Sequence, residues 1–315
     1  MPIDLHKKST IVKNVAQQLG FDQCGIARAE RLDSDAKRLE HWLNKGYHGE
    51  MGYMENHFEM RVDPSKLVPG AKSVITLLYN YYPDDQQNPD SPKVAKYAFG
   101  NDYHDVIRIK LNEFLFSIRE ALGSIQGRGF VDSAPVLERS WAERSGLGWI
   151  GKNGNLINKK KGSFFFIATL ITDIELEPDL PYKQDYCGTC NKCVEACPTD
   201  AILPDKVLDA TKCISYLTIE MKSKNISEEL SKKTDNWIFG CDICQDICPW
   251  NRFSKPTKEK QFKPIREVLD FSIEDWKSLN KESFNFIFKN SAIKRSKWEG
   301  MMKNLEYFTP YKRED

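Results

Sequence analysis

The chain has 315 residues, of which 40% are hydrophobic and 29% are charged, and its formal net charge is +1. These values describe a soluble globular protein long enough for two domains, without the global electrostatic field that marks many nucleic-acid-binding proteins. The longest apolar stretch, residues 164–171, is too short to cross a bilayer, and the N-terminus has neither a hydrophobic signal core nor a twin arginine. We therefore expect a cytoplasmic protein with no membrane segment, whose thiols stay reduced.

Hydrophobic periodicity predicts a mixture of helices and strands in the first half of the chain. Apolar residues have helical spacing over residues 5–19, 36–43 and 106–122, and strand-like apolar runs occur at residues 24–27, 73–79 and 130–131. Residues 155–158 and 164–171 flank Lys159-Lys160-Lys161-Gly162, a pattern that predicts a hairpin with a charged turn. Glycines and prolines predict loops over residues 46–54 and 83–92 and a linker over residues 178–181. This order predicts an α+β fold with a first domain over residues 1–175, a cysteine-rich domain over 176–255 and a short helical tail over 256–315.

Eight of the nine cysteines lie in the second of these regions. The first block is Cys187-x2-Cys190-x2-Cys193-x3-Cys197-Pro198, the second is Cys241-x2-Cys244-x3-Cys248-Pro249, and Cys213 lies between them. The first block has the spacing of bacterial two-cluster ferredoxins, in which the fourth cysteine binds the other cluster. We therefore assign Cys187, Cys190, Cys193 and Cys248 to cluster 1, and Cys197, Cys213, Cys241 and Cys244 to cluster 2, as two [4Fe–4S] centres.

Other roles for these cysteines are less consistent with the pattern. Structural zinc also uses pairs of cysteines two residues apart, but triple spacing that ends in Cys-Pro is unusual for zinc. Disulfide frameworks belong to short secreted chains, and this chain is long and has no signal peptide. Cys24 stands alone on a predicted strand, where we expect a small buried hydrophobic residue rather than a metal ligand.

A second region of interest runs from the predicted strand at residues 130–131 into a predicted helix. Asp132 and Ser133 are suitable N-cap residues and Pro135 suits a first helical turn, so Asp132 could be a simple cap. Four glycines between Gly146 and Gly154 would let the backbone approach a flat or phosphate-bearing ligand. Neither signal identifies a function by itself.

Together, these segments resemble the epoxyqueuosine reductase family over nearly the whole chain and in the family's order. The resemblance is carried by Gly46-Tyr47-His48-Gly49-Glu50-Met51, Tyr97-Ala98-Phe99-Gly100-Asn101-Asp102-Tyr103-His104, Val131-Asp132-Ser133-Ala134-Pro135, Gly148-Trp149-Ile150-Gly151-Lys152-Asn153 and the eight-cysteine region. It implies a cobalamin enzyme related to reductive dehalogenases, with a nitroreductase-like cobalamin-binding domain followed by a ferredoxin-like domain that holds two [4Fe–4S] clusters. The implied activity is reduction of epoxyqueuosine to queuosine at the wobble position of tRNA with GUN anticodons, the last step of queuosine biosynthesis. Family members often carry a C-terminal helical-repeat extension, which we do not expect here.

The resemblance also implies roles for single residues. Asp132 is the implied proton donor to the epoxide oxygen, which near neutral pH requires that burial raise its pKa. Removal of that oxygen needs two electrons and a proton donor, and iron–sulfur clusters can supply electrons at the low potential that cob(I)alamin formation demands. The supporting residues are Tyr103, His104 and Arg139, although His104 could equally be a satisfied buried histidine. The candidate cobalamin contacts are Tyr97, Asp132, Trp149, Lys152, Asn153 and Ser215.

Two further features of the sequence bear on the form of the cofactor and on the contacts with tRNA. Asp102-Tyr103-His104-Asp105-Val106-Ile107 lacks the glycine of the Asp-x-His-x-x-Gly motif, which favours base-off cobalamin without a protein histidine ligand. Basic residues near Trp298 could be a solvated helix face, but a tRNA substrate would favour phosphate contacts. The predicted tRNA contacts are Trp250, Arg252, Lys294, Arg295 and Lys297. We expect a monomer that receives electrons from an unidentified low-potential donor.

Three alternatives stay open at this point. A reductive dehalogenase acting on small organohalides would share the cofactors, but most are exported with a twin-arginine signal. A simple electron-transfer ferredoxin would not bind cobalamin. A zinc-stabilised RNA-binding protein would contain no iron.

Overall fold

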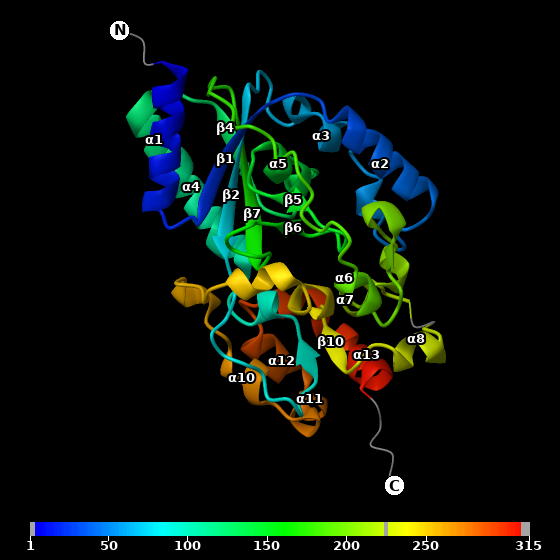
Figure 1. Cartoon of the computed structure of the whole chain (residues 1–315). Coiled ribbons are helices and arrows are strands. Elements are labelled where there is room, and N and C mark those ends of the chain that lie inside the picture. Colours follow the sequence, from blue (N-terminus) through cyan, green and yellow to red (C-terminus); the bar gives the residue numbers. More distant parts are fainter. Residues whose placement is uncertain (1–3, 224–225, 310–315) are drawn as a thin grey trace.

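The computed structural model describes residues 4–223 and 226–309. Residues 1–3, 224–225 and 310–315, which fall in the three predicted regions, lie outside the described residues. A sheet flanked by helices forms one end of the molecule, and the C-terminal helices form the other (Figure 1). No helix in the described ranges is long and apolar enough to cross a membrane.

The sheet is antiparallel, with the strand order β1-β2-β7-β4. Its strands are β1 (Gln23–Arg28), β2 (Ser73–Asn80), β4 (Gly127–Phe130) and β7 (Phe165–Thr172). The strands predicted at residues 24–27, 73–79 and 164–171 are confirmed. β4 begins earlier than predicted, because Gly127 and Gly129 pair with Thr172 and Leu170 instead of forming a turn.

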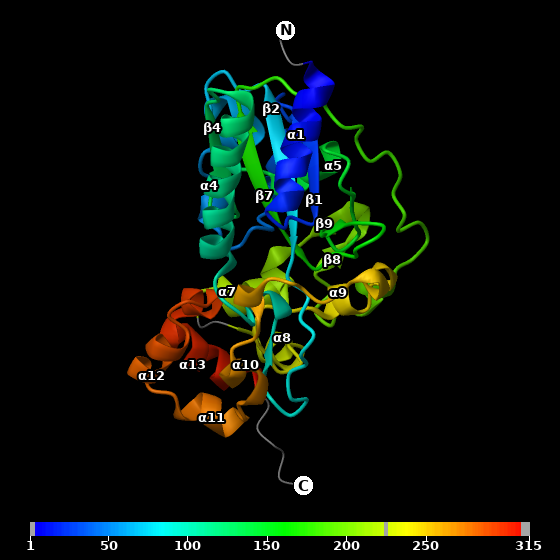
Figure 2. The same ribbon diagram turned by 90° about the vertical axis from the view of Figure 1, so that its left-hand side faces the viewer.

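Helices cover both faces of this sheet. On one face, α1 (Leu5–Gln18) and α4 (Tyr103–Leu122) lie side by side (Figure 2). On the other face lie α2 (Asp33–Asn44), α3 (Phe58–Val62) and α5 (Glu138–Arg144). Side chains alternate along β2, so that Leu77 joins the core under α1 and α4 while Val74 joins the core under α2 and α5. All three predicted helices are confirmed, and Cys24 packs against the first core as expected.

The hairpin predicted around Lys159-Lys160-Lys161-Gly162 is wrong in its pairing. β6 (Leu156–Ile157) pairs with β5 (Trp149–Ile150), whereas both edges of β7 are occupied by β2 and β4. One isolated bridge, between Asn158 and Gly162, joins the two sides of the turn. β6 therefore forms a separate two-stranded sheet with β5 instead of joining β7.

The cysteine-rich region contains only short elements. These are α6 (Lys192–Glu195), β8 (Ile202–Leu203), β9 (Val207–Leu208), α7 (Ile214–Ile219), α8 (Glu228–Lys232), β10 (Trp237–Phe239) and α9 (Ile243–Asp246). The loop after α2 docks on this region, since the Glu50 N–H donates a 2.8 Å hydrogen bond to the Tyr216 hydroxyl. Gly49 has a φ of +56°, and a Cβ there would lie 2.4 Å from that hydroxyl, so the docking requires glycine.

The C-terminal helices are not a peripheral tail. They are α10 (Arg266–Asp270), α11 (Ile273–Ser278), α12 (Lys281–Ile287) and α13 (Lys297–Phe308). Trp276, Phe288 and Met301 share a hydrophobic core with Phe99 and Phe239. In the same part of the molecule, β10 pairs in parallel with β3 (Lys93–Val94). Segments from all three predicted regions therefore meet here, and this core supports the start of α4. The predicted domain boundaries stay a prediction.

Candidate active site and cluster-binding cysteines

The first group of thiols lies where α6 and α9 pack together. Cys187 and Cys190 precede α6, Cys193 lies within it, and Cys248 follows α9. Burial raises the pKa of the Cys193 thiol, and charges on Cys187, Cys248 and Cys190 raise it further. Cys193 thus interacts with the other three cysteines assigned to cluster 1.

The second group surrounds Cys244. Burial raises the pKa of this thiol, and the thiols of Cys213, Cys193 and Cys197 are among the neighbours that raise it further. Cys241 interacts in the same way with Cys244 and Cys213. These contacts bring together the four cysteines assigned to cluster 2 and place them next to the first group. Across residues 4–223 and 226–309, no three or more His, Cys, Asp or Glu side chains converge on a single metal ion. A [4Fe–4S] cluster instead binds each of its four cysteines at a different iron.

The glycine-rich segment after α5 contacts the thiol loops. The Trp149 Nε1–H donates a 3.4 Å hydrogen bond to Cys187 Sγ, and Lys152 Nζ donates to the Gly188 carbonyl at 2.9 Å. The Asn153 Nδ2–H donates to the Cys244 carbonyl at 3.2 Å. A Cβ on Gly148 would lie 2.2 Å from the Ile157 carbonyl oxygen, so this glycine is required by β5–β6 packing, not by a ligand.

Asp132 lies in the loop between β4 and α5. The helix begins at Glu138 with Leu137 as its N-cap, so the interpretation of Asp132 as an N-cap is wrong. Asp132 has a φ of 53°, and its backbone N–H donates a 2.9 Å hydrogen bond to Glu138 Oε1. A left-handed conformation is uncommon outside glycine and is often found at functional sites.

Two residues at the start of α4 hold the Asp132 side chain. The Tyr103 hydroxyl donates a hydrogen bond to the Asp132 carboxylate, and His104 Nε2 lies 3.4 Å from Asp132 Oδ2. The other ring nitrogen of His104, Nδ1, lies 2.7 Å from Oδ1 of Asp102, the N-cap of α4. Tyr97 packs edge-on against Tyr103 with ring centres 6.0 Å apart, and it also packs on the small core beside Cys241. Tyr97 therefore links the Asp132 group to the second thiol group.

The pKa values of Asp132, His104 and Glu138 decide which of these side chains hold a proton. Burial raises the pKa of Asp132, but hydrogen bonds from His104 and Tyr103 and the charge of His104 bring it below its usual value. The pKa of Asp132 is therefore lowered, which is opposite to the raised pKa that its implied role as proton donor requires. Burial lowers the pKa of His104, but its hydrogen bonds with Asp102 and Asp132 raise it to about 9. Burial and the nearby Asp132 charge raise the pKa of Glu138 to about 8. At neutral pH, His104 and Glu138 hold protons and Asp132 is ionised.

Comparison with known proteins identifies the family. The family model for a 4Fe-4S double cluster binding domain matches residues 186–251, and the model described as epoxyqueuosine reductase QueG, DUF1730, matches residues 61–133. An epoxyqueuosine reductase from Cyclobacterium marinum is 57% identical over 307 residues, which cover 96% of this chain and 97% of the relative. The chain belongs to the epoxyqueuosine reductase family.

Two solved structures of epoxyqueuosine reductases bear on the site. One contains an epoxyqueuosine-modified tRNA-Tyr stem loop; it is 30% identical, with a TM-score of 0.84 over 94% of this chain and 79% of that chain. The other, from Bacillus subtilis, has its catalytic aspartate loop swung out of the active site. It is 29% identical, again with a TM-score of 0.84 over 94% of this chain and 79% of that chain.

The remaining predicted residues of this chain divide between the Asp132 group and the Trp149 segment. Lys294 Nζ lies 3.0 Å from Asp102 Oδ2, and Arg295 binds both carboxylate oxygens of Glu220 at 2.9 Å. Arg139 donates to the Gly154 carbonyl and interacts with the Asp132 charge. By contrast, Trp250 packs edge-on against Trp149, with ring centres 5.2 Å apart, and Arg252 lies next to it. Ser215 is half-buried, and its backbone N–H hydrogen-bonds to Cys213, whereas Lys297 is exposed at the start of α13.

Sequence reasoning missed three carboxylates of this reductase site. Glu138 follows Asp132 by six residues across an irregular loop, a separation that has no characteristic spacing. Glu220 comes from the cysteine-rich region, so only the tertiary fold brings it to Arg295. Asp102 had a detectable signal, because an aspartate directly before an apolar helical pattern is a typical N-cap.

Proposed function

We propose that this chain reduces the epoxide of epoxyqueuosine to the alkene of queuosine at the wobble position of tRNA. The observation that carries the proposal is the position of Asp132, which Tyr103 and His104 hold and which Tyr97 links to the second thiol group. A proton source and an electron source therefore meet at one place. Family membership and the related complex with a modified stem loop support the substrate.

The reaction takes two electrons and two protons, and the epoxide oxygen leaves as water. The eight cysteines fit two [4Fe–4S] clusters, since their thiols form two groups of four that are next to each other. The second group is the inner one, because Tyr97 joins it to the Asp132 group. Electrons therefore enter at the first group and leave from the second.

The residues around Asp132 also fit a cobalamin. Both His104 ring nitrogens have carboxylate partners, which leaves no free histidine nitrogen there to bind cobalt. Asp132, Ser133 and Arg139 are exposed, so a cofactor can reach them from solvent. When bound, base-off cobalamin would supply a strongly reducing, nucleophilic cobalt.

We assign contacts with this cofactor to Tyr97, Asp132 and Ser215. Trp149, Lys152 and Asn153 act one step further away, because they fix the thiol loops through hydrogen bonds. If these three side chains also contact the cofactor, they do so through atoms that these hydrogen bonds leave free.

The proton comes from the pair formed by His104 and Asp132. His104 is protonated at neutral pH, and its Nε2 lies beside Asp132 Oδ2. A proton that passes from Nε2 to Oδ2 would make Asp132 the acid that the developing alkoxide meets. Asp102 and Lys294 fix the far side of the imidazole, which keeps Nε2 directed toward Asp132. Solvent supplies the second proton.

The remaining parts of the proposal concern the setting of the reaction. The substrate would be tRNA with a GUN anticodon, whose loop is already single-stranded, so the modified base can enter the site at low cost. Lys297 is exposed at the start of α13 and is the proposed phosphate contact, whereas Lys294 and Arg295 are held near the Asp132 group by Asp102 and Glu220. We further propose a cytoplasmic monomer that obtains electrons from a low-potential carrier.

A single-turnover assay tests the function. The holoenzyme, reduced with dithionite, is mixed with epoxyqueuosine-containing tRNA, and the digested nucleosides are analysed by mass spectrometry. We expect the wild-type enzyme to remove one oxygen atom and form queuosine. The Asp132→Ala variant should form no queuosine although it retains its clusters and cobalamin. A cobalamin-loaded wild-type enzyme that forms no queuosine would refute the substrate, and an active Asp132→Ala enzyme would refute the acid.

A further inference from the structure

The first thiol group lies beneath a surface of aromatic and cationic side chains. We name this surface the cluster-1 face and define it by Lys159, Tyr186, Ile247, Trp250, Arg252 and Phe253. Its residues form a continuous set, since Lys159 Nζ lies 4.6 Å from the Tyr186 ring centre and Tyr186 packs edge-on against Trp250. Trp250 in turn packs on Trp149, whose indole N–H binds Cys187 Sγ. Only the Trp149 side chain therefore separates Trp250 of this face from Cys187, a proposed cluster ligand.

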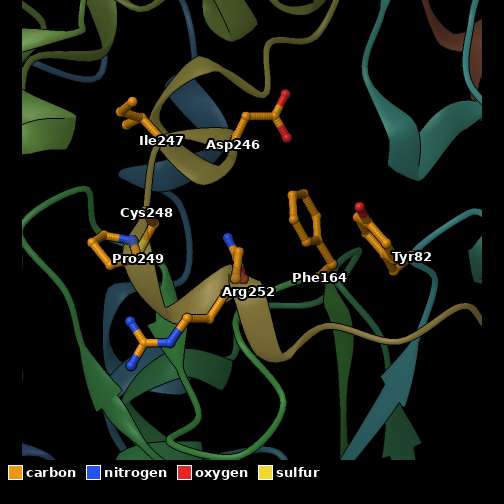
Figure 3. A pocket seen from close by; sticks show the side chains of 8 residues that line it. Tyr82, Phe164, Asp246, Ile247, Cys248, Pro249 and Arg252 are labelled. Atoms are coloured by element: carbon orange, nitrogen blue, oxygen red, sulfur yellow. The ribbon is translucent and has the colours of Figure 1, made fainter.

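The same surface is hollowed beside another ligand of the first group. A hollow of about 460 Å³ is lined by Tyr82, Phe164, Cys248, Pro249 and Arg252, among others. Figure 3 shows the rings of Phe164 and Tyr82 on one side of this hollow and Cys248 and Pro249 on the other. Ile247, which lines this hollow, and Phe253, which packs on Trp250, have 43% and 38% of their surface exposed.

The charge of the face is positive. Arg252 lies 4.5 Å from the Phe253 ring centre and Lys159 lies over Tyr186, so both cations contact aromatic rings. The nearby Asp246 carboxylate is neutralised by Lys96 Nζ at 2.6 Å. An exposed apolar centre with cations around it favours a partner that has a complementary acidic surface.

We propose that the cluster-1 face docks an acidic protein that carries one electron at low potential, an inference that rests on the proposed function. In each encounter the carrier is oxidised by one electron and the first cluster is reduced by one, so two encounters supply one epoxide reduction. A tRNA whose wobble base reaches Asp132 would lie at the other end of the electron path, beside the second cluster. Trp250 and Arg252 therefore belong to the carrier surface and not to the tRNA surface for which the sequence suggested them.

The test compares charge reversal on the face with a matched reversal elsewhere. Oxidised holoenzyme is mixed with a reduced, acidic plant-type ferredoxin, and freeze-quench EPR follows the transfer of electrons to the [4Fe–4S] clusters at several salt concentrations. The test variant is Lys159→Glu combined with Arg252→Glu, and Arg252→Gln is a milder version in case the double variant loses clusters. The control is Lys289→Glu, because Lys289 Nζ also lies near an exposed ring, 5.8 Å from the centre of Phe286.

We expect the second-order rate of the double variant to fall about tenfold at low salt and to approach the wild-type rate at high salt, with no change in the control. Dithionite-driven queuosine formation should be the same in all of these proteins, since dithionite does not need to dock. An unchanged carrier rate would overturn the proposal, and a loss of tRNA affinity at an unchanged carrier rate would assign the face to phosphate binding. Failure of the dithionite reaction in the wild type would refute the proposed function separately.

Discussion

The Asp132 backbone N–H donates a 2.9 Å hydrogen bond to Glu138 Oε1, which ties the loop before α5 to the first residue of that helix. The bond holds Asp132 in its left-handed conformation, with a φ of 53°. In the Bacillus subtilis relative, the catalytic aspartate loop is swung out of the active site. In this chain, Glu138 holds the Asp132 loop against the start of α5.

Replacement of Glu138 by Ala should loosen the Asp132 loop. One hydrogen bond contributes about 1 kcal/mol, so its loss should lower the ratio of held to released loops about fivefold, and the single-turnover rate should fall by up to that factor. Glu138→Gln should retain most of the rate, because the amide keeps an acceptor oxygen and resembles the acid that a pKa of about 8 leaves protonated at neutral pH. Hydrogen exchange over residues 131–137 should increase in the Ala variant only. Equal rates and equal exchange in all three proteins would contradict this role.

The pH dependence of the reaction should report His104. Burial lowers the pKa of this imidazole, and its hydrogen bonds with Asp102 and Asp132 raise it to about 9, so the proton is present below that pH and is lost as the pH rises through it. The single-turnover rate should therefore fall on the alkaline side of pH 9. His104→Gln should be slower by about 10²-fold, as expected for loss of a general acid, and its rate should lack this alkaline limb. Asp102→Asn serves as the comparison, because loss of one raising partner should move the limb to lower pH. If the single-turnover rate of His104→Gln fell at alkaline pH as the wild-type rate does, a group other than His104 would cause that decrease.

The assignment of Cys248 to the first cluster predicts that variants of two cysteines in the same sequence block lose different clusters. Cys248→Ser and Cys241→Ser alter the same sequence block, but the thiol contacts place Cys248 with Cys187 and Cys190, and Cys241 with Cys213 and Cys244. Each variant should lose one cluster and retain about half of the iron, because each cluster needs four thiolates. The EPR signals of the clusters that remain should differ between the two variants. Identical residual EPR signals would mean that Cys241 and Cys248 bind the same cluster, which would contradict the assignment. Cys24→Ser is the control and should retain the full iron content.

The parts of this site that were predictable are those whose chemistry depends on spacing along the chain. The cysteine grouping was predicted from spacing, because the last cysteine of each run is expected to bind the other cluster. Tyr103 and His104 share the first turn of α4 with their cap Asp102. Trp149 and Lys152 were predicted as cofactor contacts from the family resemblance, and the glycines around them were a weak signal, since Gly148 serves the packing of β5 on β6. The pKa of Asp132 was predicted in the wrong direction, since burial alone was considered. The partners that lower it converge on Asp132 only in the tertiary structure.

The basic residues near α13 should separate into two functions. Arg295 is held by Glu220, and its charge helps to lower the pKa of Asp132, whereas Lys297 is exposed and its neighbour Glu299 pairs with Lys281 at 2.8 Å. Lys297→Ala should therefore weaken tRNA binding and reduce the slope of log affinity against log salt by about 0.9, as expected for one phosphate contact. Arg295→Ala should mainly lower the single-turnover rate at saturating tRNA, because Glu220 would be left unpaired near the Asp132 group. Filter binding over a salt series measures the first effect, with Lys289→Ala as the control cation. A salt slope that changes in Arg295→Ala but not in Lys297→Ala would reverse the assignment, since it would mean that tRNA displaces Glu220 from Arg295.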